Sequence, residues 1–209
     1  MSIKYRPEPL NEFSLEWIIR ELNRISYAFD KMDGLWDDLR FPATSINLPG
    51  SGSPPGVDTT YGGTYLFNAS STEYLFAVAQ LPHAWKVGTT LRPHIHWEKT
   101  TSASGDVYWR LEYEWHKIGE VAGSTQTLNA TTVADGTPDD DTANKQLITS
   151  LGDITTSGVD ISDVLTMKIS RIGGDAADTY GADARFIEFD IHIQTDQNGS
   201  EKQFIKDTR

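Results

Sequence analysis

Two histidines and a glutamate alternate with other residues in the stretch Pro-His-Ile-His-Trp-Glu, as His94, His96 and Glu98. On a β-strand, successive side chains point to opposite faces, so these three would share one face. Imidazole nitrogens and carboxylate oxygens are common ligands of zinc and iron in proteins. One hypothesis is therefore that His94, His96 and Glu98 bind a single metal ion.

The pattern that runs from Gly88 through His94, His96 and Glu98 to Gly105 resembles the first motif of the cupin superfamily. That resemblance implies a metal-dependent jelly-roll enzyme with these three side chains as ligands. The cupin glutamate usually follows after a longer gap, however, and the second cupin motif is missing. We therefore predict a hydrogen-bonded or interface histidine pair, with no metal and no cofactor, and keep the cupin-like enzyme as the alternative.

Other catalytic motifs are missing from the sequence. It contains no Gly-x-Ser-x-Gly nucleophile elbow, no phosphate-binding loop ending in Gly-Lys-Ser or Gly-Lys-Thr, and no His-Glu-x-x-His. We predict that the protein is not an enzyme and has no catalytic residues. Six tryptophans and eight tyrosines make a carbohydrate-binding module a third hypothesis, because aromatic rings offer flat apolar surfaces with polar edges.

The composition restricts the partners. The 30 acidic residues outnumber the 18 basic ones, and the formal charge is −12, so the surface repels nucleic acids and anionic lipids. No stretch approaches the roughly 20 apolar residues that a membrane-spanning helix needs. Cysteine is absent, which excludes disulfides and thiolate metal sites. We predict no nucleic-acid partner and no membrane partner.

Strands are expected over most of the chain. Apolar and polar residues alternate strictly in residues 107–116, 165–170 and 187–194, which is the pattern of a strand with one buried face. Weaker candidates are residues 65–67, 74–79, 91–98 and 147–151. These elements predict a mainly β fold, an antiparallel β-sandwich of the jelly-roll type, preceded by one N-terminal α-helix.

Large apolar residues recur near the N-terminus at alternating spacings of three and four. They are Leu15, Ile18, Leu22, Ile25, Phe29 and Met32. This spacing is an a/d seam, and large aliphatic residues at both positions favour three or four helices over two. We predict an oligomerisation helix and a homotrimer. An ordinary amphipathic helix packed on its own domain is the alternative.

The sequence divides into three parts. Residues 1–38 form a helical oligomerisation and attachment segment, residues 39–64 a Pro/Gly-rich junction, and residues 65–209 the β-sandwich body. Prolines and glycines lead us to expect no regular element anywhere in residues 35–64. Four residues are candidates for attachment to a larger particle, namely Trp17, Trp36, Leu39 and Phe41. The alternative is that they fold back and cover the end of the sandwich.

A family resemblance adds to these patterns. The helical segment Phe13-x3-Trp17-x3-Glu21-Leu22-x2-Ile25-x2-Ala28-Phe29 is similar to short N-terminal helices of phage tail and head-appendage proteins. Residues 37–44, 82–85, 93–97 and 170–175 are similar to proteins of phage structural modules. The resemblance covers most of the chain and includes no catalytic motif.

This resemblance implies a structural protein of the tailed-phage virion that assembles in the host cytoplasm. The implied position is head decoration, a head or neck fibre, or a tail appendage. Its partners would be further copies of itself and other virion proteins, such as capsid, portal or neck, and tail proteins.

Overall fold

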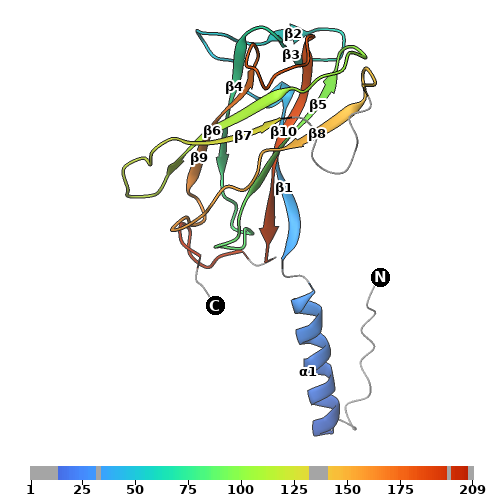
Figure 1. Ribbon diagram of the computed structural model, residues 1–209. Coiled ribbons are helices and arrows are strands. Elements are labelled where there is room, and N and C mark those ends of the chain that lie inside the picture. Colours follow the sequence, from blue (N-terminus) through green and yellow to red (C-terminus); the bar gives the residue numbers. More distant parts are fainter. Residues whose placement is uncertain (1–13, 32–33, 132–140, 197–198, 207–209) are drawn as a thin grey trace.

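The computed structural model describes residues 14–31, 34–131, 141–196 and 199–206. Within these residues one α-helix, α1 (Leu15–Asp30), precedes a body built of β-strands. Figure 1 shows α1 projecting away from the body rather than lying against either sheet. The helix begins at Ser14, whose side chain accepts a hydrogen bond from the Trp17 backbone N–H at 3.2 Å, as an N-cap residue does.

The strands form two antiparallel sheets that pack face to face. In chain order they are β1 (Leu35–Pro42), β2 (Gly56–Asp58), β3 (Thr64–Phe67), β4 (Thr72–Gln80), β5 (Arg92–Lys99), β6 (Tyr108–His116), β7 (Gln126–Thr131), β8 (Gln146–Ser150), β9 (Val164–Ile172) and β10 (Ala184–Thr195). One sheet has the order β2-β3-β10-β5-β8, with β1 also on β10, and the other has the order β4-β9-β6-β7. This architecture confirms the predicted jelly-roll-like β-sandwich preceded by a helix.

The core lies between the sheets and contains the alternating apolar residues that the sequence predicted. Trp109 of β6 packs edge-on against Trp97 of β5, with ring centroids 6.0 Å apart, and against Phe67 of β3 at 5.2 Å. All three side chains are fully buried. Edge-to-face aromatic pairs of this kind add about 0.5–1.5 kcal/mol beyond the burial of their area, so these rings join the two sheets.

Strand β10 is the centre of the six-stranded sheet. It pairs with β5 along one side and with β3 and then β1 along the other. The register with β5 shifts between Phe186 and Glu188, as at a β-bulge. The simple alternation predicted that Ile187 faces the core, but Phe186 is the fully buried residue and Ile187 is only partly buried.

The expectation of no regular element in residues 35–64 is wrong. Strand β1 pairs along its whole length with β10, a short 3₁₀ helix η1 (Ala43–Ser45) follows, and β2 pairs with β3. Residues 35–41 contain neither Gly nor Pro, and Pro42 is tolerated because it ends a strand at the sheet edge. The predicted boundary between residues 38 and 39 therefore falls inside β1.

No helix of the described residues, α1 included, is long and apolar enough to cross a bilayer.

Candidate functional site

His94 and His96 lie on the face of β5 that points away from the core, next to Asp190 of β10. The strand pairing places His94 opposite Asp190, and paired residues of antiparallel strands project to the same face. One ligand atom from each of the three side chains lies within 4.8 Å of the other two. The fold thus brings together a cluster of two imidazoles and one carboxylate, which we call the His-Asp-His cluster.

The carboxylate of Asp190 lies between the two rings. His94 Nε2 is 2.5 Å from Asp190 Oδ1, and His96 Nε2 is 3.1 Å from Asp190 Oδ2. The other ring nitrogens have partners as well: His96 Nδ1 is 2.7 Å from Gln146 Nε2, and His94 Nδ1 is 3.4 Å from the Arg92 carbonyl oxygen. Both rings are therefore held on two sides with Nε2 directed at Asp190.

The cluster is nearly closed to solvent. Asp190 is 5% exposed and His94 is 6% exposed, and His96 is partly buried. Burial alone would raise the pKa of Asp190, but its contacts with His94 and His96 outweigh that effect and bring the pKa to about 2. Burial would likewise lower the pKa of His94, but the Asp190 carboxylate outweighs it and raises that pKa above its ordinary value. The carboxylate and a positive charge beside it stabilise each other.

Glu98 shares the face of His94 and His96 but is not part of the cluster. Its Oε2 accepts a hydrogen bond of 2.8 Å from Arg185 Nη1, and Arg185 Nε donates to Asp58 Oδ2, also at 2.8 Å. The cupin-like set of His94, His96 and Glu98 is therefore not what the fold assembles, because Arg185 engages the glutamate and Asp190 lies beside the histidines.

Sequence reasoning missed Asp190 because nothing local connects it to His96, which precedes it by 94 positions. The available signal was its place on the polar side of a predicted strand, two residues before His192. The polar sides of β6 and β9 lie on the other sheet, where Lys168 pairs with Glu112 at 2.8 Å.

The rim of the cluster is built by β1 and β10. The His192 ring lies 4.2 Å from the His94 ring, centroid to centroid, and His192 Nε2 is 3.2 Å from Asp38 Oδ1. Trp36 lies beyond His192, and the Arg92 guanidinium lies over its ring at 4.8 Å. The half-exposed His192 marks the side on which solvent reaches the cluster.

The predicted oligomerisation residues of α1 form one apolar stripe, and no residue of this helix is buried. Their exposed fractions are 72% for Leu15, 40% for Ile18, 59% for Leu22, 51% for Ile25 and 64% for Phe29. Met32 lies outside the described residues. Ile19, which is 50% exposed, widens the stripe. Residues spaced three and four apart share a helix face, so the stripe is continuous.

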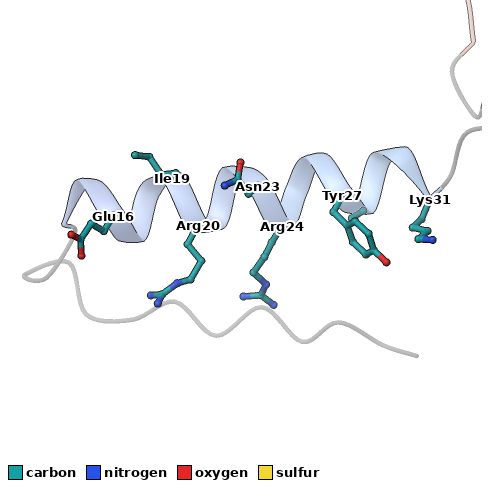
Figure 2. Close-up of a pocket in the computed structure, with 8 residues that line it drawn as sticks. Glu16, Ile19, Arg20, Asn23, Arg24, Tyr27 and Lys31 are labelled. Atoms are coloured by element: carbon teal, nitrogen blue, oxygen red, sulfur yellow. The ribbon is translucent and has the colours of Figure 1, made fainter.

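The neighbouring flank of α1 is mostly polar. Figure 2 shows side chains along this flank, and its residues are Glu16, Ile19, Arg20, Asn23, Arg24, Tyr27, Ala28 and Lys31. Arg24 also pairs with Glu21 at 2.9 Å on the helix surface. A flank of a single helix with mixed charges is a solvated surface, and it carries no candidate site.

The four predicted attachment residues divide between two environments. Leu39 and Phe41 of β1 are partly buried and pack against the core, and Phe41 stacks on Phe189 with ring centroids 5.6 Å apart. Trp36 is 46% exposed on the same strand, and Trp17 of α1 is partly exposed. Leu39 and Phe41 therefore pack against the core, and Trp36 is the exposed member of the set, whereas Trp17 is partly buried like Leu39 and Phe41.

No protein-family model and no curated protein match the chain. Among solved structures, the chain is similar to a family 35 carbohydrate-binding module from an environmental isolate, at 8% identity and a TM-score of 0.43, over 73% of this chain and 91% of that one. It is also similar to a chain in the structure of infectious bursal disease virus, Gx strain, at 11% identity and a TM-score of 0.37, over 79% and 33% of the two chains. A third is the insecticidal delta-endotoxin Cry8Ea1 from Bacillus thuringiensis, at 14% identity and a TM-score of 0.38, over 76% and 24%. Likenesses this distant carry no argument about what this chain binds.

Proposed function

We propose that the protein is a non-enzymatic structural component of a tailed-phage virion that assembles as a homotrimer through α1. The observation that carries this proposal is the stripe of large apolar residues on a helix that buries none of its residues within its own chain. An apolar surface of this kind marks a site of association. The sequence of this helix resembles the N-terminal helices of phage tail and head-appendage proteins, and this resemblance supports a tailed-phage virion as the particle.

A helix of 16 residues is marginally stable in water on its own, and most helices gain their stability by packing an apolar face. Each large apolar side chain that leaves water contributes about 1.5–3 kcal/mol. Copies of α1 that pack stripe to stripe would supply that burial. Large aliphatic residues such as Leu22 and Ile25 at both seam positions favour three helices over two.

Attachment to other virion proteins is assigned to the N-terminal part of the chain. Trp36 and Trp17 are the residues that we propose for contact with capsid, portal or neck, or tail proteins, since Leu39 and Phe41 pack against the core. The body carries an excess of acidic residues, and a charged surface keeps neighbouring copies on a crowded particle from associating.

Two other functions receive no support from a specific observation. A cupin-like enzyme would use Glu98, which pairs with Arg185. A carbohydrate-binding module would need an open aromatic surface, whereas Trp97 and Trp109 are buried and the Trp36 ring lies under the Arg92 guanidinium.

The experiment has two parts. Light scattering on the full chain is expected to give about three times the chain mass of 23.3 kDa, and a monomer at micromolar concentration would contradict the trimer. Deleting residues 1–33 removes α1 and leaves β1 intact. The shortened protein is expected to stay folded and to be absent from purified virions in a complementation assay. Trp36 remains in the shortened protein. If that protein is incorporated at normal occupancy, α1 and Trp17 are not needed for attachment and their part in the proposal is wrong.

A matched control separates loss of the seam from a general change in the helix. Asn23→Glu adds a charge to the solvated flank of α1 and is expected to leave both the mass and the incorporation unchanged.

A further inference from the structure

The His-Asp-His cluster is a donor set without a role in the proposed assembly. Two imidazoles and one carboxylate are among the commonest three-ligand sets for zinc in proteins. We propose that His94, His96 and Asp190 bind one divalent transition-metal ion of the zinc class on the outer face of the six-stranded sheet. This inference replaces the expectation, drawn from the sequence, that the histidine pair binds no metal.

The spacing of the three side chains suits one ion. Zinc lies about 2.0–2.2 Å from nitrogen and oxygen ligands, so two ligands of one ion are at most about 4 Å apart. The three ligand atoms already lie within 4.8 Å of one another. Movements of under about 1 Å therefore bring the widest pair into range, and the ion would enter between Asp190 and the rings.

The second argument is the burial of the carboxylate. Asp190 is 5% exposed, and its two oxygens lie 2.5 Å from His94 Nε2 and 3.1 Å from His96 Nε2. A buried carboxylate needs positive charge or donors beside it. A divalent cation bound by these three side chains would supply that charge in place of the ring protons.

The third argument is the shell around the histidines. The Arg92 carbonyl can only accept, so His94 Nδ1 carries a proton toward it. His94 Nε2, which faces Asp190, is then the nitrogen that could bind an ion in exchange for its proton. The Gln146 side-chain amide nitrogen lies 2.7 Å from His96 Nδ1 and fixes the orientation of that ring. Ring nitrogens of metal-binding histidines are oriented by such outer partners.

The cluster therefore supplies three ligands, and a four-coordinate ion would have one further position for water. Because His94 and His96 come from β5 and Asp190 from β10, the ion would cross-link two neighbouring strands of one sheet. Binding of an ion to the folded state alone stabilises that state by mass action.

The test uses the full chain without a histidine tag, freed of metal by a chelator. Calorimetric titration with zinc chloride and elemental analysis after gel filtration are expected to give one zinc per chain. His94→Gln and Asp190→Asn are expected to weaken zinc binding by at least about tenfold. Cobalt in place of zinc is expected to give visible d–d absorption, which is lost in His96→Gln. This second readout covers the case in which Asp190→Asn does not fold.

Two control variants sharpen the result. His116→Gln removes a histidine from the second sheet, where it contacts Thr166, and Glu98→Gln removes the carboxylate of the cupin-like set. Both are expected to bind zinc as the unaltered chain does. Folded protein that takes up no stoichiometric zinc, or His94→Gln that binds with unchanged affinity, overturns the proposal. Loss of zinc in Glu98→Gln would instead assign the site to the cupin-like set.

Discussion

Arg171 and Asp178 form a two-pronged ion pair in which neither side chain is exposed to solvent. Arg171 Nε and Nη2 donate to the two Asp178 oxygens at 2.9 and 2.8 Å. The remaining guanidinium hydrogens go to the carbonyls of Phe67, Tyr180 and Ala182. The end of β9 is thus joined to β3 and to the loop that leads into β10.

Asp178→Asn is expected to lower the free energy of unfolding by about 3–5 kcal/mol, because it leaves the buried Arg171 charge without a counter-ion. Chemical denaturation at neutral pH measures this loss. Glu112→Gln removes one partner of the surface pair with Lys168, which is of similar length but about one-third exposed, and is expected to cost under about 1 kcal/mol. If the two variants lose equal free energy of unfolding, burial is not what makes the Arg171–Asp178 pair costly to break.

Leu22→Glu combined with Ile25→Glu is expected to prevent the proposed trimer and give a monomer, because two charges would enter the apolar stripe of α1. Asn23→Glu combined with Tyr27→Glu adds the same charge to the flank shown in Figure 2 and should leave the trimer intact. Light scattering at several concentrations distinguishes the two outcomes. Monomerisation by both pairs would point to net charge, rather than the stripe, as the cause.

Acid should weaken the contact between Asp58 and Arg185. The hydrogen bond from Arg185, and then the one from the Thr60 backbone N–H, lower the pKa of Asp58 below its ordinary value of 3.8. The unfolded chain therefore takes up the proton first as the pH falls. The stabilisation is complete above the unfolded pKa and is lost as the pH drops through the folded one.

The measurement compares urea midpoints of the unaltered chain and Asp58→Asn between about pH 7 and pH 3. The difference is expected to be largest near neutrality and to shrink below about pH 4. Asp153→Asn, at a half-exposed residue 3.6 Å from Arg92, controls for the loss of a surface charge. A difference for Asp58→Asn that stays constant with pH would count against this ion pair.

Lys206 fastens the C-terminal segment to the body. Its Nζ donates to the carbonyls of His83 and Trp85 at 2.9 and 2.8 Å and pairs with Asp196 at 2.7 Å. Lys206→Met should lower the free energy of unfolding by about 1–3 kcal/mol, since buried carbonyls lose their donor. Lys31→Met, at an exposed helix end, is the charge-matched control. Thermal unfolding curves that coincide for the two variants would show that the anchor is unimportant.

The sequence predicts the interior of this fold well and its edges poorly. Alternation over residues 107–116 and 165–170 is a local signal, and Trp109, Leu111 and Ile169 face the core as it requires. Strand β1 has no such signal, because Leu35 and Trp36 are adjacent apolar residues that break the alternation. Its existence depends on the free edge of β10, which a local pattern does not reveal.

The same distinction applies to the candidate site. The spacing of His94 and His96 is visible in the sequence and places both on one face of β5. The third member follows from the register between β5 and β10, which the bulge after Phe186 helps to set. Glu98 is also a possible metal ligand at the same two-residue spacing. It pairs instead with Arg185, which, like Asp190, is too far away in the sequence for the local pattern to reveal the contact.

The position of β10 in the sheet has a consequence for synthesis on the ribosome. This strand pairs with β1, β3 and β5 (Figure 1), and Leu35 lies opposite Thr195. The six-stranded sheet therefore cannot close until β10 has emerged, whereas α1 emerges well before β10. Contacts this distant in sequence form slowly, and chains grow at roughly 5–20 residues per second. During that interval the helices of neighbouring nascent chains on one messenger RNA are free to meet before their bodies have folded.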